Sequence, residues 1–133
     1  MQINYTHTIL FVKDQHLSTD FYTKLFRQQP ILNVPGMTEF LLHGNHTLGL
    51  MPNNGIAKIL SPKIPHPEKG IGIPRCELYF YISNLEQEYN YILTIGATLI
   101  SPIEERNWGD KTCYFSDLDG HILAFAEKIK MPP

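Results

Sequence analysis

Residues 115–128 read FSDLDGHILAFAEK and combine a polar turn with a short apolar strand. Asp117, Asp119 and Gly120 are residue types that tight turns favour. The run HILAFAEK that follows is short and apolar and begins at this turn, which is typical of a final strand. Ala124 stands in the middle of this strand, and its side chain has no polar atom.

The same pattern occurs earlier in the chain, so we expect an internal repeat. GNHTLGL (44–50) matches DGHILAF (119–125), and His7 matches Glu77 at the start of an earlier strand. Asn84 is predicted to cap a helix in the second copy. Both copies are predicted to follow a βαβββ order. The elements that the pattern indicates are strands at 7–14, 39–43, 46–51, 76–83, 98–103, 111–117 and 121–128, and helices at 15–28 and 84–97.

The segment 52–74 has a different composition from the rest of the chain. It holds five of the ten prolines and three glycines, which favours a structureless linker between two modules. We therefore predict an α+β fold in which residues 1–133 form one domain of two modules. The first module covers 1–51, and the second covers 75–130.

The composition excludes several classes of function. With 133 residues, 43% hydrophobic and 18% charged, the chain has a globular composition. A net charge of −2 gives no electrostatic reason to expect nucleic acid or an anionic membrane as partner. There is no apolar run of the roughly 20 residues that a membrane span needs. Two cysteines without a CxxC pair and an N-terminus without signal-peptide features favour a cytoplasmic protein.

Alternation along the strands places chemically distinct residues on one face. Tyr79 and Tyr81 share a face with Glu77, whereas Leu78 and Phe80 lie on the other face, which a helix could cover. A carboxylate beside two tyrosines suggests the lining of a cavity. A plain solvent-exposed sheet face explains the same pattern equally well, and the residues alone leave both interpretations open.

Three stretches carry a resemblance to a known family. HTILFVKD (7–14), STDFYTKLF (18–26) and WGDKTCYFSDLDGHILAFAE (108–127), in this order and spacing, resemble the vicinal oxygen chelate superfamily. That superfamily includes glyoxalase I, extradiol dioxygenases, fosfomycin-resistance enzymes and bleomycin-resistance proteins. The resemblance covers essentially the whole chain. It implies two modules whose curved mixed sheets surround a cavity, usually in a homodimer.

The resemblance also implies where a metal would be held. The four equivalent strand positions in this sequence are His7, Gly49, Glu77 and Ala124. The side chains of His7 and Glu77 are able to bind a metal, but those of Gly49 and Ala124 are not. Because a catalytic metal usually has at least three protein ligands, we expect no metal, no other cofactor and no catalytic residues.

The two small residues suggest a different use of the cavity. Gly49 and Ala124 are expected to open space for a ligand, and Trp108 is expected to stack on it. The chain most resembles the metal-free branch with the bleomycin- and phenazine-resistance proteins, which implies sequestration of an aromatic or antibiotic-like molecule. The predicted ligand-binding residues are His7, Ile9, Phe11, Gly49, Met51, Glu77, Tyr79, Tyr81, Trp108, Ile122 and Ala124.

Two other functions remain open. One is a metal-dependent enzyme of the glyoxalase or dioxygenase type that uses an atypical site of His7 and Glu77. The other is an accessory interaction domain whose cavity is vestigial. A hydrogen-bonded pair of His7 and Glu77 that faces the ligand is a further role for these two residues.

Overall fold

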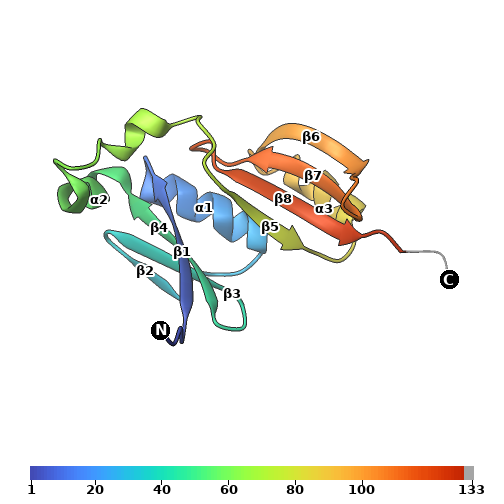
Figure 1. Cartoon of the computed structure of the whole chain (residues 1–133), viewed down its shortest axis with the longest axis horizontal. Coiled ribbons are helices and arrows are strands. Elements are labelled where there is room, and N and C mark those ends of the chain that lie inside the picture. The colour runs from blue at the N-terminus through green and yellow to red at the C-terminus, as the bar shows by residue number, and fades with distance from the viewer. Residues whose placement is uncertain (131–133) are drawn as a thin grey trace. The chain divides into compact units, whose positions relative to one another are not determined.

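The computed structural model describes residues 1–130 and divides them into two compact units, Met1–Ile71 and the chain from Gly72 onward. Each unit contains a βαβββ module, which confirms the predicted α+β class (Figure 1). No helix within residues 1–130 is long and apolar enough to cross a membrane. The elements are β1 (Thr6–Val12), α1 (Gln15–Phe26), β2 (Leu32–Val34), β3 (Met37–His43), β4 (His46–Pro52), α2 (Asn53–Leu60), the 3-10 helix η1 (Pro67–Gly70), β5 (Glu77–Tyr81), α3 (Leu85–Ile92), β6 (Thr98–Glu105), β7 (Asp110–Ser116) and β8 (Ile122–Lys128).

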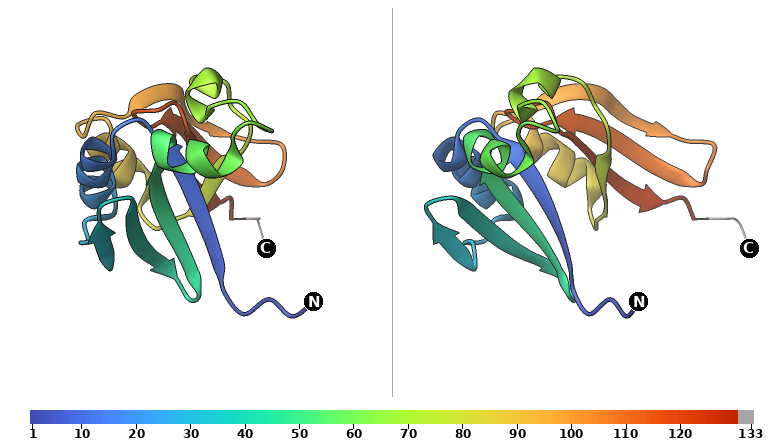
Figure 2. Two further views of the ribbon diagram at one scale, coloured as in Figure 1. Left: turned by 90° about the vertical axis from the view of Figure 1, so that its left-hand side faces the viewer. Right: turned by 60° about the vertical axis from the view of Figure 1, so that its left-hand side comes forward.

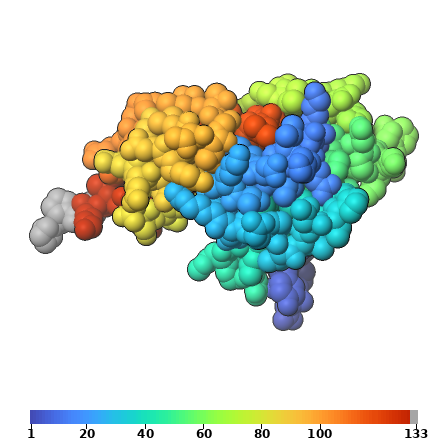
Figure 3. Space-filling model, turned by 180° about the vertical axis from the view of Figure 1, so that it is seen from behind, coloured from blue at the N-terminus to red at the C-terminus, as the bar shows by residue number. Residues whose placement is uncertain are grey.

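The first unit is a four-stranded mixed sheet with α1 on one face. Its strand order is β1-β4-β3-β2, with β1 parallel to β4 and the other pairs antiparallel. Tyr22 and Phe26 of α1 pack against Phe40, at ring-centroid distances of 6.5 Å and 5.6 Å. Leu48 and Leu50 of β4 are fully buried beneath them. In the space-filling view of Figure 3 the blue segment that includes α1 lies at the surface of the first unit.

The hairpin between β3 and β4 has the two-residue turn that the sequence predicted. His43 pairs with His46, so Gly44 and Asn45 alone form the turn. Of these two residues only Gly44 has a positive φ, of 56°. A glycine at the first central position with positive φ is the pattern of a type II′ turn, which suits the twist of a hairpin.

The second unit repeats this plan. Its strand order is β5-β8-β7-β6, with β5 parallel to β8. Phe80, Phe115 and Phe125 form the apolar face of the sheet, and Tyr89 of α3 packs on Phe115 at 5.7 Å between ring centroids. The right-hand view of Figure 2 shows α3, in yellow, against one face of this sheet. Within residues 72–130, no helix packs on the opposite face, which carries Tyr79.

The segment 52–74 is not structureless, contrary to the sequence prediction. It contains α2 and η1, and the first unit extends through Ile71. The prolines lie outside the helix interiors: Pro52 precedes α2, Pro62 follows it, and Pro67 begins η1. Because proline is tolerated at a helix start and after a helix end, a proline-rich composition did not exclude helices here.

Asn84 does not cap α3 with its side chain, which corrects a second prediction. Asn84 has a left-handed backbone with φ 58° and makes no side-chain cap hydrogen bond. The first backbone N–H of the helix, on Leu85, instead donates to Glu127 Oε1 of β8 at 2.6 Å. A carboxylate at a helix N-terminus satisfies an otherwise unpaired N–H and interacts favourably with the helix dipole.

Replacing the carboxylate that caps α3 is expected to destabilise the second unit. Glu127→Ala leaves the Leu85 N–H without its acceptor, so the free energy of unfolding should fall by about 1 kcal/mol, the usual effect of losing an N-cap. Urea denaturation followed by circular dichroism measures this change. Glu105→Ala removes an equal charge from exposed Glu105 of β6 and is the matched control. An equal loss of stability in both variants would contradict the capping role.

Candidate functional site

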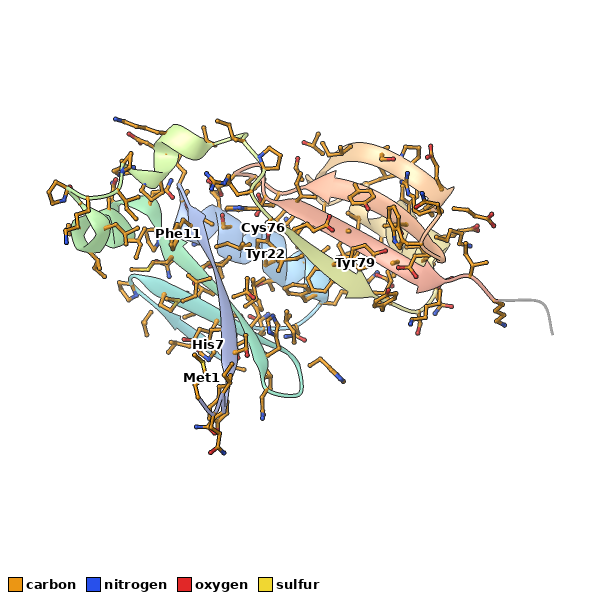
Figure 4. The ribbon with its side chains drawn as sticks, viewed as in Figure 1. Met1, His7, Phe11, Tyr22, Cys76 and Tyr79 are labelled. Atoms are coloured by element: carbon orange, nitrogen blue, oxygen red, sulfur yellow. The ribbon has the colours of Figure 1, made fainter. Side chains whose placement is uncertain are left out.

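The predicted site residues of the first unit lie on the sheet face opposite α1. Ile9 pairs with Gly49, and Phe11 pairs with Met51, across the parallel strands β1 and β4. His7 is exposed near the start of β1 and pairs with Thr47. Figure 4 labels His7 and Phe11 along this strand. The register thus brings five predicted residues onto one largely apolar face, as alternation required.

Gly49 does not open the space that was expected of it. A Cβ built on Gly49 would lie 3.1 Å from Ile9 Cγ1 and 3.2 Å from Met37 Sδ. Both distances are shorter than ordinary van der Waals contact, so neighbouring side chains already occupy the position above the glycine. The small residue accommodates Ile9 and Met37 and does not leave a hollow.

Ala124 in the second unit does not open space for a ligand either. It pairs with Tyr79 of β5 and Tyr114 of β7, and its exposed fraction is 0%. Since paired residues point to the same face of a sheet, a tyrosine flanks the alanine on each side. Ile122 and exposed Glu77 form the next pair along this face. The expected opening at Ala124 is therefore filled.

The strongest cluster of polar contacts on this face lies around Asp110, the first residue of β7. Tyr79 Oη donates to Asp110 Oδ2 at 2.6 Å, and Tyr81 Oη donates to the same oxygen at 2.8 Å. Trp108 Nε1 donates to Tyr79 Oη at 3.0 Å, and Thr112 Oγ1 lies 3.1 Å from that hydroxyl. We name these five residues the Asp110 cluster. Figure 4 labels Tyr79 on β5.

A tight connection between β6 and β7 positions Trp108 in this cluster. The backbone N–H of Arg106 donates to the carbonyl of Asp110 at 2.8 Å, and that of Gly109 donates to the carbonyl of Arg106 at 3.3 Å. Gly109 has φ 90°, a value that residues with a Cβ rarely adopt. The glycine therefore lets the chain reverse within a few residues, and Trp108 is held next to the strand that carries Asp110.

The charge state of the cluster follows from these hydrogen bonds. The hydroxyl of Tyr79, ahead of that of Tyr81 and the ammonium of Lys128, lowers the pKa of the Asp110 carboxyl below its ordinary value, although burial opposes this effect. Conversely, the hydrogen bond to Asp110 raises the pKa of Tyr81, and burial and the negative charge add to the shift. At neutral pH the cluster is an anionic carboxylate that accepts two phenol hydrogens.

Next to the Asp110 cluster, the side chain of Arg106 covers the ring of Tyr114. The Arg106 guanidinium lies 5.3 Å from the ring centroid of Tyr114 and donates to Glu104 Oε2 and Ser101 Oγ, each at 3.0 Å. Burial is the main cause that raises the pKa of Tyr114. These bonds fix Arg106 over β7, so the accessible aromatic surface is at Tyr81 and Trp108.

The four positions at which the resemblance implied a metal do not fit one in this chain. Of the four equivalent positions, Gly49 and Ala124 have no ligand atom in their side chains. His7 and Glu77 belong to different units. Among residues 1–130, no three His, Cys, Asp or Glu side chains come together in a metal-binding arrangement. A metal that completes its coordination from this chain lacks the donors that catalytic sites usually have.

Several members of the site were missed from the sequence. Asp110, Thr112 and Tyr114 alternate with buried Cys113 and Phe115, so period-two alternation along β7 could have assigned them to the open face. Their proximity to Tyr79 and Tyr81 depends on β8, which lies between β5 and β7 in the sheet. Pairing of that kind cannot be found from alternation within one strand.

Comparisons with known proteins agree on one fold. A family model described as a glyoxalase-like domain matches residues 5–130. The uncharacterized protein Mb0911c of Mycobacterium bovis is 24% identical over 124 residues, which cover 91% of this chain and 81% of that protein. A glyoxalase-related enzyme from Fulvimarina pelagi superposes with a TM-score of 0.79 at 17% identity, covering 96% of this chain and 89% of that one. A glyoxalase/bleomycin resistance protein/dioxygenase family enzyme from Burkholderia phytofirmans PsJN superposes with a TM-score of 0.78 at 16% identity, covering 92% and 97%.

Neutralising Asp110 should make Tyr81 a stronger acid. The raised pKa of Tyr81 means that its protonated form stabilises the fold below the ordinary value of 10.0, and this contribution is lost as the pH rises through the raised value. In Asp110→Asn no carboxylate opposes the phenolate, so the component that Tyr81 contributes to the alkaline titration of tyrosine absorbance should move to lower pH. Tyr81→Phe should remove the same component.

A matched control is Asp20→Asn, a change at an exposed residue of α1, which should leave the Tyr81 component unchanged. A titration curve of Asp110→Asn that overlays that of the wild type would contradict the assignment.

Proposed function

This chain belongs to the family of glyoxalase-like domains, within the vicinal oxygen chelate superfamily, and from that premise we propose that it binds a small, partly aromatic molecule. Binding takes place at the Asp110 cluster, on the open face of the second sheet. The ligand is sequestered and is not chemically changed.

The exposed aromatic rings at a buried carboxylate are the observation that carries this proposal. Tyr81 is 56% exposed and Trp108 is 55% exposed, whereas Asp110 of the same cluster is 4% exposed. Large exposed rings are normally mobile, but here the Tyr81 hydroxyl and the Trp108 indole are hydrogen-bonded within the cluster. Rings that are fixed before binding lose little entropy when a ligand stacks on them, which favours affinity.

An open hollow beside the cluster offers room for a ligand. It has a volume of about 570 Å³ and includes Tyr81, Ala126 and Lys128 among its lining residues. This volume falls within the range of small-molecule sites, roughly 300–1,000 Å³. A ligand that stacks on Tyr81 can therefore extend over the end of β8.

The geometry supports sequestration more than catalysis. Both tyrosine hydroxyls donate to Asp110 Oδ2, so this oxygen is a weak base. The side chains at the four candidate metal positions do not fit a catalytic metal. Cys113 is buried, and burial raises the pKa of its thiol to about 11, which makes it a poor nucleophile.

One observation favours a second candidate, the accessory interaction domain. The positions above Gly49 and Ala124 are filled by the chain's own side chains, as in a vestigial cavity. The exposed rings at the Asp110 cluster favour ligand binding over this candidate. The homodimer expected from the family resemblance stays a prediction.

Fluorescence of Trp108, the only tryptophan, tests the proposal. Titration with phenazines, bleomycin-like glycopeptides and a panel of aromatic metabolites should give a saturable change for at least one compound. N-acetyltryptophanamide serves as the reference for absorption of light by the compounds. The dissociation constant should lie below about 1 mM, because a weaker affinity corresponds to less than ~4 kcal/mol of binding free energy.

Two variants separate specific binding from general adsorption. Tyr81→Ala should weaken binding of the compound about tenfold, since stacking contributes roughly 1 kcal/mol or more. Tyr5→Ala removes an exposed tyrosine of the first unit and should have no effect. If no compound gives saturable binding, or if both variants behave alike, the chain does not sequester ligands at this cluster.

A further inference from the structure

The charge of the Asp110 cluster indicates which ligands it would favour. Asp110 places a negative charge at the hydroxyl ends of Tyr79 and Tyr81, and the indole of Trp108 bonds to the Tyr79 hydroxyl. Each phenol donates its hydrogen toward the carboxylate, which increases the electron density of the ring. A cation over an electron-rich ring is attracted by the ring and by a carboxylate at the edge of that ring.

The chain's own lysine already occupies such a position. Lys128 pairs with Asp110 across β7 and β8, and its Nζ lies 5.3 Å from the centroid of the Tyr81 ring. The positive charge of Lys128 also contributes to the low pKa of Asp110. Lys128 is exposed, so its flexible side chain can move into solvent without breaking a buried contact. The position over the Tyr81 ring therefore accepts an ammonium group, and a ligand can displace the one that Lys128 supplies.

The charged side chains near the cluster do not make the rings favour an anion over a cation. The hollow next to Tyr81 includes Lys128, Lys130 and Glu127 among its lining residues. Glu127 is engaged with the N-terminus of α3. Lys128 and Lys130 could attract an anion to the outer part of the hollow, but an anion against the rings would meet the charge of Asp110. At the rings, a cationic ligand is therefore expected to bind more tightly than an anionic one.

We propose that the Asp110 cluster binds an organic cation, an ammonium or quaternary ammonium group carried on an apolar or aromatic body. The cationic group lies over Tyr81 and Trp108 and displaces the ammonium of Lys128, while the body extends into the hollow beside Tyr81. This inference rests on the proposed small-molecule function and names the class of ligand. No covalent step is involved.

Three probes of similar size test the charge preference. Choline, its neutral isostere 3,3-dimethylbutan-1-ol and the anion 3,3-dimethylbutanoate are titrated into the full chain at constant ionic strength, and Trp108 fluorescence is followed. Choline should bind about tenfold more tightly than the neutral alcohol, as a cation–π contact supported by a carboxylate predicts. The anion should bind no better than the alcohol.

Substitutions at Lys128 and Asp110 are expected to change choline binding in opposite directions. Lys128→Met removes the competing ammonium and should tighten choline binding about threefold or more. Lys111→Met makes the same change of charge on β7, where Lys111 pairs with Glu127 on the other face, and should leave the affinity unchanged. Asp110→Asn should abolish the preference for choline over the alcohol. Its folding is checked by circular dichroism, and Lys128→Met provides the test if Asp110→Asn does not fold.

Different results would contradict the cation preference and the binding of small molecules. Equal binding of choline and the alcohol, or tighter binding of the anion, would overturn the cation preference while small-molecule binding remains supported. Weaker choline binding in Lys128→Met would also overturn it. If choline gives no saturable change up to about 10 mM, the inference is wrong, and the aromatic panel then decides whether the binding function survives.

Discussion

The buried carboxylate of Asp110 is the constraint on which the open face of the second sheet depends. An ionised carboxylate that is almost inaccessible to water is costly unless hydrogen-bond donors satisfy it. Tyr79 and Tyr81, two residues apart on β5, supply two donors to one oxygen, and the Trp108 indole bonds to the first of these hydroxyls. Satisfying one charge therefore holds three aromatic side chains in defined positions on this face of the sheet.

The fold could be predicted largely from local patterns. The βαβββ order follows from alternation in the strands and from the match of residues 44–50 with 119–125, because both signals lie within short stretches of sequence. Two details depended on more than local sequence. The helix α2 forms between prolines that flank it, and Glu127 of β8 takes the capping role predicted for Asn84. Composition reports what a segment contains but not where its prolines fall relative to a helix, and a cap supplied by a distant strand leaves no local signal.

The site was predicted less completely, for two physical reasons. Tyr79 and Tyr81 could be found because alternation along a single strand fixes their face, whereas Asp110 and Lys128 reach them through strand pairing that the sequence does not state. The expected space at Gly49 and Ala124 is absent because protein interiors are close-packed, so a small residue is usually matched by larger neighbours. Ile9 and Met37 fill the first position, and tyrosines flank the second.

Nitrogen–proton NMR of the labelled chain provides a decisive test of the arrangement around Asp110. Trp108 is the only tryptophan, so its indole N–H gives a single signal that needs no further assignment. If Trp108 Nε1 donates to Tyr79 Oη, the variant Tyr79→Phe removes the acceptor while the fold persists. The indole signal should then shift, and its exchange with water should become faster, while the dispersed backbone signals of the two sheets remain. An indole signal with the same position and the same exchange rate in wild type and Tyr79→Phe would show that the Asp110 cluster does not hold Trp108 in place.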